Sequence, residues 1–234
     1  MRKIVILTLP LLLFSLTGCN KNEVTYQKID DISVYYSTEK VASQIEAAQG
    51  LNTFTYKIVQ NAKNFKYVTE RQFDIDYLYC SDYMKLGDDV SWQKQLHLPN
   101  FDDYSKAMRY IVDNASSSST QGQLVNEVFS EELDAGRKLV YNQISDPSYI
   151  ARQYFLGDVT GTWYKGSDST LKFKVVGEDE KSTGSLIFDL ETLFIKSVSI
   201  TVPSEELGTC KVKMNFTYPN SLKHKTPEDI GYKS

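Results

Sequence analysis

The feature that most constrains this fold is a long two-residue alternation between apolar and polar side chains. From Phe65 to Tyr79, aromatic or aliphatic residues share one parity (Phe65, Tyr67, Phe73, Ile75, Tyr77, Tyr79) and polar residues share the other (Lys66, Glu70, Gln72, Asp74, Asp76). A shorter run with Phe54, Tyr56 and Ile58 precedes it, and residues 61–64 supply turn formers. Successive side chains of a strand point to opposite faces, so the pattern predicts a hairpin with one apolar and one solvated face.

The same alternation returns after Gly161 and predicts about five more strands. Three of its runs are centred on Phe173, Ile200 and Met214. Antiparallel sheets that are covered on one face show this pattern, whereas parallel strands buried on both faces read as continuous apolar runs. The C-terminal third is therefore expected to be an antiparallel meander.

Helices are expected before the hairpin and in the middle of the chain. Ser37 or Thr38 can cap a helix that runs to about Gln49 and ends at Gly50. Helical spacing of apolar residues predicts three more helices within about residues 101–156, at about 102–114, 123–139 and 147–156. The combined prediction is an α+β fold: a curved antiparallel sheet, a half-barrel, covering helices, with a helical middle segment.

The N-terminus has the layout of an export sequence. Arg2 and Lys3 precede an apolar run that begins at Ile4 and is too short to span a bilayer, which needs roughly 20 apolar residues. Leu16-Thr17-Gly18-Cys19 then resembles the lipobox of bacterial lipoproteins. The resemblance implies a signal peptide over 1–18 and a diacylglyceryl group, with palmitate-type acyl chains, on Cys19. A lipidated tether over 19–36 and a single domain over 37–234 would follow. The expected location is the cell envelope, outside the cytoplasm and anchored to a membrane by lipid.

The charge balance restricts the expected partners. Without residues 1–18 the chain has 24 basic and 30 acidic residues, a net charge of −6. Nucleic-acid-binding proteins present a basic patch, so the excess of acid argues against a nucleic-acid partner. It also argues against electrostatic attraction to anionic lipid headgroups, which leaves the acyl group as the expected membrane contact.

Two cysteines remain once Cys19 is assigned to lipid. Cys80 and Cys210 both end strand-like runs, and an even pair in an exported protein is compatible with a disulfide. Two unpaired, partly buried thiols are the alternative. Neither cysteine belongs to a closely spaced pair, so the spacing has no metal-site signature.

The order of these features resembles the half-barrel lipoprotein carriers. A lipobox, a first helix leading into a long aromatic hairpin, and a C-terminal meander closing at Tyr218-Pro219 are similar to the superfamily of the periplasmic lipoprotein chaperone and the mycobacterial lipid-carrying lipoproteins. The resemblance covers roughly residues 37–220 and implies that a cupped sheet holds an apolar or lipid-like ligand. The concave face would then comprise Phe54, Tyr56, Ile58, Tyr67, Phe73, Ile75, Val198, Ile200, Met214 and Phe216.

An alternative is open from the same residues. If no cavity exists, these ten side chains form an ordinary solid core. The protein would then be a structural or interaction lipoprotein, of the cystatin-like or NTF2-like kind, that docks to an envelope protein.

Enzymatic patterns are incomplete in this chain. Ser37 and Lys40 match the S-x-x-K of penicillin-recognising enzymes, but the companion motifs are defective and a helix cap explains both residues. His97 and His224 belong to no hydrolase or zinc motif, and paired aspartates such as Asp74 and Asp76 have the solvent parity of a strand. We therefore expect a non-catalytic protein without a metal or cofactor, and a degenerate serine enzyme using Ser37 and Lys40 is the remaining alternative.

Overall fold

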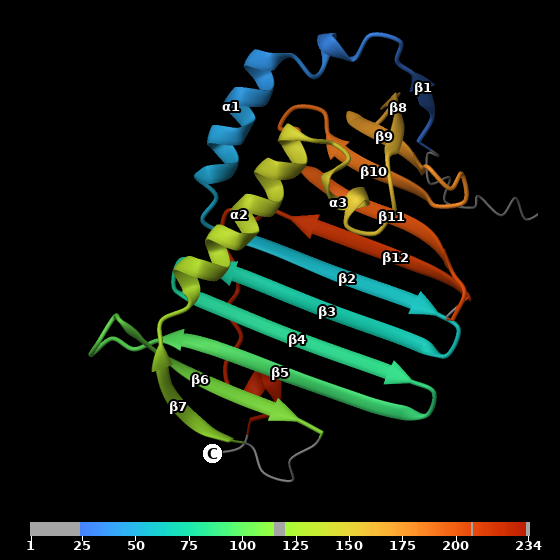
Figure 1. The fold of residues 1–234 in the computed structure, drawn as a ribbon. Helices are drawn as coiled ribbons and strands as arrows, with labels where there is room; N and C mark the ends of the chain where they lie inside the picture. The colour runs from blue at the N-terminus through green and yellow to red at the C-terminus, as the bar shows by residue number, and fades with distance from the viewer. Residues whose placement is uncertain (1–23, 115–119, 207, 233–234) are drawn as a thin grey trace, which may run out of the picture.

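The computed structural model describes residues 24–114, 120–206 and 208–232, which form one twelve-stranded antiparallel sheet with two long helices against one face (Figure 1). The strands are β1 (Tyr26–Lys28), β2 (Phe54–Ala62), β3 (Phe65–Asp74), β4 (Tyr77–Leu86), β5 (Asp89–Pro99), β6 (Lys106–Asp113), β7 (Thr120–Asn126), β8 (Val159–Gly166), β9 (Thr170–Gly177), β10 (Thr183–Asp189), β11 (Ile195–Ser204) and β12 (Gly208–Thr217). The helices are α1 (Thr38–Gln49), α2 (Phe129–Ser145) and α3 (Tyr149–Arg152), with 3₁₀ turns η1 (Ile32–Val34) and η2 (Glu228–Ile230).

The sheet consists of two meanders joined at its centre. Its spatial order is β1-β8-β9-β10-β11-β12-β2-β3-β4-β5-β6-β7, so the last strand pairs with the first strand of the hairpin. In that junction Met214 lies opposite Ile58 and Phe216 lies opposite Tyr56. The sheet curves but does not close, because β1 and β7 are its two edges. This confirms the α+β class, the curved antiparallel sheet and the five C-terminal strands.

The main core lies between the concave face of the sheet and the helices. Phe54 is 1% exposed and stacks on Phe73 and Phe216, with ring centroids 5.8 and 6.1 Å away. Helix α2 approaches this aromatic cluster at Gly136, where an added Cβ would lie only 2.8 Å from Phe54 Cδ1. Close packing without a side chain at Gly136 therefore lets α2 fill the concavity.

A second, smaller core lies on the opposite face of the sheet. The segment 219–232, which includes η2, crosses behind β4–β6 (Figure 1). Ile230 is buried there against Tyr77, Tyr79 and Leu96. These outward-parity residues of β4 and β5 are therefore apolar because the C-terminal segment covers them.

The expected helical middle is wrong in its first part. Residues 106–113 form strand β6, with Ala107 facing the main core and Tyr110 facing the C-terminal segment. A strand that is buried on both faces carries apolar residues at both alternating positions, so the polar–apolar alternation is absent and the apolar residues fit helical spacing instead.

The rest of the middle differs in its boundaries. The expected helix at 123–139 is replaced by β7 followed by α2, which begins at Phe129 and ends at Ser145. Of the expected third helix, only the four residues of α3 are helical.

Part of the expected tether over 19–36 is structured. β1 pairs antiparallel with β8, and the Asp31 side chain accepts a hydrogen bond from Ser33 N at the start of η1. Residues 24–36 therefore belong to the folded domain. The expected signal peptide and Cys19 lie outside the described residues. None of the described helices is long and apolar enough to cross a membrane.

Candidate functional site

Most of the residues predicted to line a ligand cup are in the main core. Those that are buried are Phe54, Phe73, Val198, Ile200, Met214 and Phe216, while Tyr56 and Ile58 are half-buried against the same cluster. Tyr67 lies farther along β3, half-buried, and its hydroxyl donates to Asp82 Oδ1 at 2.9 Å. The structure thus brings together most of the predicted set, but as a packed core.

Ile75 is the one member of the set that the structure places outside it. It lies in the two-residue turn between β3 and β4 and is 62% exposed. The turn resets the parity, so that Tyr77 and Tyr79 point to the outer face while Phe73 points to the inner one. The single strand predicted over 65–79 is therefore wrong, and with it the place of Ile75.

An open hollow adjoins this core where β11 begins and β12 ends. Its volume is about 600 Å³, and its lining includes apolar and aromatic residues (Leu51, Phe194, Phe216, Tyr218) and charged ones (Asp189, Glu191, Lys196). Tyr218 donates a hydrogen bond to Ile195 O at 2.8 Å, and burial raises the pKa of this phenol. Phe216 is the one predicted ligand residue that lines this hollow.

A polar cluster lies on the inner face around Arg71. Its guanidinium donates two hydrogen bonds to Asp82, at 3.0 and 2.9 Å. Burial is the largest single effect on the pKa of Asp82 and raises it, but the hydrogen bonds and positive charge of Arg71, with the hydrogen bond from Tyr67, together outweigh burial, and the net shift is downward. Burial also raises the pKa of Tyr56 to about 12 and that of Cys80 to about 11. A nucleophile needs a lowered pKa, so these groups are structural rather than activated.

The cysteines predicted as a possible pair are both free. Cys80 is on β4 and Cys210 on β12, and β2 and β3 lie between these strands. Three interstrand spacings put these strands about 14 Å apart across the sheet, and the register, which aligns Cys80 with Phe216, adds six residues along β12, so the two cysteines are far beyond the reach of a disulfide. The alternative with two unpaired thiols is the one that the structure shows.

Ser37 and Lys40 form a helix cap rather than a catalytic pair in this structure. Ser37 Oγ accepts a hydrogen bond from Lys40 N at 3.3 Å, in the ordinary N-cap geometry of α1. The Lys40 ammonium donates instead to Leu190 O at 2.6 Å.

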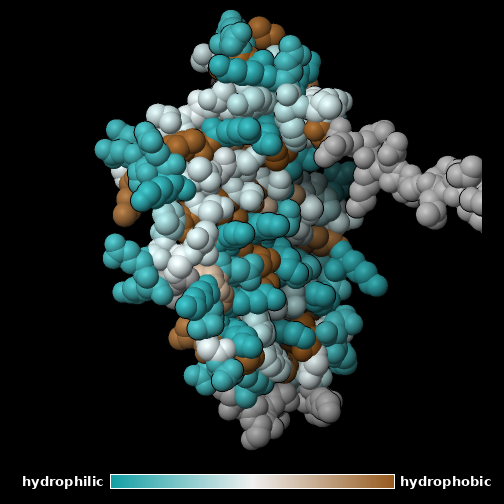
Figure 2. Space-filling view, turned by 90° about the vertical axis from the view of Figure 1, so that its right-hand side faces the viewer, coloured by the Kyte–Doolittle hydropathy of each residue, from teal (hydrophilic) through white to brown (hydrophobic). Residues whose placement is uncertain are grey.

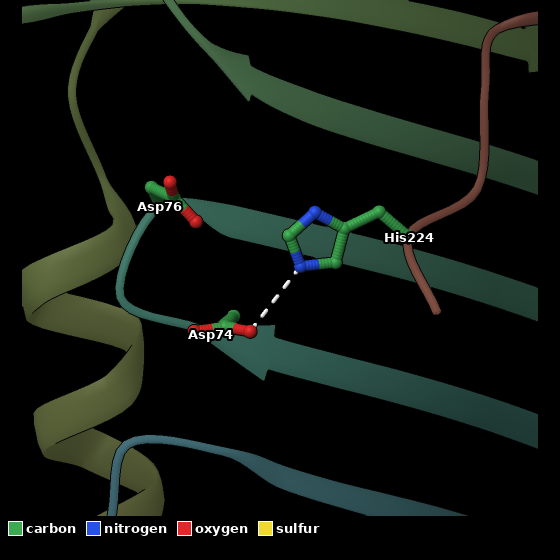
Figure 3. Close-up of side chains that lie close together, drawn as sticks. All are labelled: Asp74, Asp76 and His224. Carbon is green, nitrogen blue, oxygen red and sulfur yellow. Dashed lines mark hydrogen bonds and ion pairs between the residues drawn. The ribbon is translucent and has the colours of Figure 1, made fainter. Parts of the chain in front are cut away.

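A cluster that the sequence analysis did not find joins the β3–β4 turn to the C-terminal segment. Asp74, Asp76 and His224 offer ligand atoms that all lie within 4.8 Å of one another (Figure 3). His224 Nε2 lies 3.2 Å from Asp74 Oδ2, and its ring stacks on Tyr77 with centroids 4.1 Å apart. One imidazole and two carboxylates could hold a divalent cation of the zinc or manganese type.

The geometry of this cluster also has a purely structural role. Tyr77 accepts a hydrogen bond from Lys225 N at 3.1 Å, next to the stacked His224 ring. These contacts fix the C-terminal segment on the sheet. Since His224 is 150 residues from Asp74, only the tertiary fold brings them together. The paired aspartates at 74 and 76 were the one element visible in the sequence.

The side of the molecule with the β2–β3 and β4–β5 turns is mainly hydrophilic. Figure 2 shows its apolar residues scattered among polar ones. The β4–β5 turn contributes Gly87 and Asp88 to an open hollow of about 500 Å³ that Lys66 and Lys85 also line.

A scan against protein-family models and a search of curated proteins found no match to this chain. The family resemblance drawn from the order of sequence features therefore stays a prediction.

Proposed function

We propose that the protein is a lipid-anchored, non-catalytic protein of the cell envelope that binds another envelope protein through its surface. The solid main core supports this version of the binding role over a lipid held inside the cup. Phe54 stacks on both Phe73 and Phe216 beneath α2, with ring centroids 5.8 and 6.1 Å away. An acyl chain in the half-barrel cup would have to displace α2, whose Gly136 lies against Phe54.

A second candidate function is binding of an apolar or amphipathic ligand outside the filled cup. It is favoured by the hollow of about 600 Å³, because its lining combines Phe194 and Phe216 with charged residues, among them Asp189, Glu191 and Lys196. Ligand sites combine apolar walls with a few polar groups in this way. The half-barrel carrier resemblance supports this candidate at the level of architecture.

Native mass spectrometry followed by organic extraction separates the two candidates. The chain from Asn20 onward retains every described residue and is incubated with extracted envelope lipids. The surface-binding proposal expects an apo mass before and after incubation. A co-purifying lipid that is lost in Phe194→Ser, but kept in the control Tyr67→Phe, would establish the second candidate instead.

The protein partner is tested by site-specific photo-crosslinking in cells. A crosslinker replaces Lys138 on α2 or Lys85 on β4, two exposed lysines on opposite faces of the sheet. The proposal expects one defined envelope protein to crosslink from one face only. Equal background crosslinking from both faces would contradict it. Membrane fractionation of Cys19→Ser tests the anchor, because the substituted chain should move to the soluble fraction.

A further inference from the structure

The outward face of the sheet is basic although the chain as a whole is acidic. Among the described residues, the outward strand positions carry ten lysines and three carboxylates, Glu70, Asp74 and Asp189. We call this surface the lysine face; its lysines are Lys28, Lys57, Lys66, Lys85, Lys94, Lys106, Lys172, Lys174, Lys211 and Lys213. The net charge of −6 therefore does not show that basic residues are concentrated on one face of the sheet.

Several of these lysines stand next to one another without neutralisation. Lys66 and Lys85 are directly opposite each other in the β3–β4 pair. Lys172 and Lys174 share a face of β9, and burial followed by the charge of Lys174 lowers the pKa of Lys172. None of the ten lysines forms an ion pair within the described part of the chain. Like charges placed directly across a sheet are destabilising, so the arrangement suits an anion supplied from outside.

Two open hollows on this face place lysine pairs beside further donors. Lys172 and Lys174 line one of about 340 Å³, together with the hydroxyl residues Thr183, Ser185, Ser199 and Thr201. Lys66 and Lys85 line the hollow of about 500 Å³ at the strand ends, where Asn64 and the carboxylate of Asp88 are also present. Ammonium and hydroxyl groups together supply the donors that phosphate oxygens accept.

Aromatic residues alternate with the lysines. Tyr83 and Trp92 are cross-strand partners on the outward face, and both are half-exposed. Lys66 Nζ lies 5.9 Å from the Tyr83 ring centroid, and Lys174 Nζ lies 4.9 Å from that of Tyr164. Lysine combined with half-exposed tyrosine and tryptophan is typical of surfaces that lie at a membrane interface.

We propose that the lysine face docks on an anionic lipid surface and binds the phosphate groups of its headgroups. This inference rests on the proposed lipid anchor for its setting. Val24, the first described residue, is five residues from Cys19, so an anchor there would lie within about 18 Å of the start of the domain. β1 follows at once, and its Lys28 belongs to the lysine face. A short connection keeps the β1 edge of the sheet, to which Lys28 of the lysine face belongs, near the bilayer.

The test is vesicle binding by the unlipidated chain from Asn20 onward. Vesicles contain either phosphatidylcholine alone or the same lipid with about 30% phosphatidylglycerol, and binding is measured by co-sedimentation at about 0.02 and 0.2 M salt. Binding to the anionic vesicles that weakens at the higher salt is expected. Binding that is equal on neutral vesicles, or indifferent to salt, overturns the proposal.

The double variant Lys66→Gln/Lys85→Gln localises the effect. Each lysine near an anionic surface contributes about fivefold to binding, so the double variant should bind roughly 30-fold more weakly. Lys138→Glu on α2 is the matched control, because it changes the net charge by the same amount on the opposite face. A thermal melt by circular dichroism checks that all variants fold. Equal losses in control and double variant overturn the assignment to this face.

The outcome is separable from that of the proposed function. The assay uses a chain without its acyl group, so a failed anchor in Cys19→Ser fractionation does not alter it. Tighter binding of duplex DNA than of anionic vesicles, with the same dependence on Lys66 and Lys85, would show a polyanion site and overturn docking on lipid.

Discussion

At the scale of single residues, His97 illustrates how burial in this sheet sets acid–base behaviour. It lies on β5 opposite Arg109 of β6 and is 6% exposed. Within the described residues its Nδ1 has no hydrogen-bond partner. Burial, and then the positive charge of Arg109, lower its pKa to about 4. The imidazole is therefore neutral in the folded protein at physiological pH.

This lowered pKa predicts acid sensitivity. An unfolded histidine has a pKa of about 6.5, so between about pH 6.5 and 4 the unfolded state binds more protons than the folded state. Stability should fall as the pH drops through this window, by about 1–3 kcal/mol in total. Urea unfolding at several pH values measures the effect. His97→Gln should flatten this part of the profile, whereas an unchanged slope would assign the acid sensitivity to other groups.

The two half-buried thiols give a second prediction at this scale. Cys80 and Cys210 are on strands too far apart to bond, and burial raises the pKa of both. The chain from Asn20 onward, purified without reductant, should show two free thiols when titrated in denaturant. In the native state both should react slowly because little thiolate is present. A mass lower by two hydrogens, restored on reduction, would contradict the separation of β4 and β12.

Residue parity could be predicted from the sequence as far as each strand is continuous. Phe54 and Tyr56 in β2, and Phe73 in β3, face the core as predicted from alternation. Ile75 does not, because a turn of only two residues separates β3 from β4 and shifts the pattern by one face. The turn residues Ile75 and Asp76 are not one of the Asn-Gly, Asp-Gly or Gly-containing pairs that mark a two-residue hairpin turn, so the sequence carries no strong signal of it.

At the scale of helices and strands, predictions held where the signals are local and failed where a strand is covered on both faces by distant segments. Helix α1 was predictable because Ser37 caps it and Gly50 ends it, and both features are local. Strand β6 was not, because Ala107 packs under the helices and Tyr110 packs under the distant C-terminal segment. Both partners come from elsewhere in the chain, so no local pattern records them.

The C-terminal segment is predicted to depend on Ile230. This side chain is 1% exposed between η2 and the outer face of β4 and β5. Ile230→Ala should destabilise the protein by roughly 2 kcal/mol, from lost burial and the cavity that remains. It should also open residues 219–232 to limited proteolysis, with cleavage sites mapped by mass spectrometry. Val34→Ala is the control, because Val34 is 74% exposed and its loss should cost little. Identical digestion of the two variants would contradict the role of Ile230.

At the scale of the whole molecule, the α+β architecture was predictable but the distribution of charge was not. Alternation predicts antiparallel strands in the β2–β3 region and in the C-terminal meander, and the caps of α1 predict a helix, whereas β6 and β7 lie where helices were expected. Net charge, however, is a sum over the whole chain, so it could not predict on which face of the sheet each lysine lies. Lys66 and Lys85 are 19 positions apart in sequence and become neighbours only through the β3–β4 register.

The lysine face predicts how stability depends on ionic strength. Its lysines repel one another across neighbouring strands, and this repulsion is screened within about 10 Å at 0.1 M salt and about 3 Å at 1 M. Lys66→Gln/Lys85→Gln should therefore be more stable than the parent chain at low salt, by roughly 0.5 kcal/mol, because it removes a directly opposed pair of like charges.

The difference between the two chains should disappear near 1 M salt, and urea unfolding at both salt concentrations measures it. Lys138→Gln serves as the control, since its side chain on α2 lies away from the lysine face. A double variant that is less stable at low salt would mean that Lys66 and Lys85 hold the sheet together. The repulsion argued for the lysine face would then be wrong. A double variant that is more stable than the parent only at low salt would instead show that the opposed lysines cost the folded protein stability. That is the expected behaviour of a surface built to bind an anionic partner.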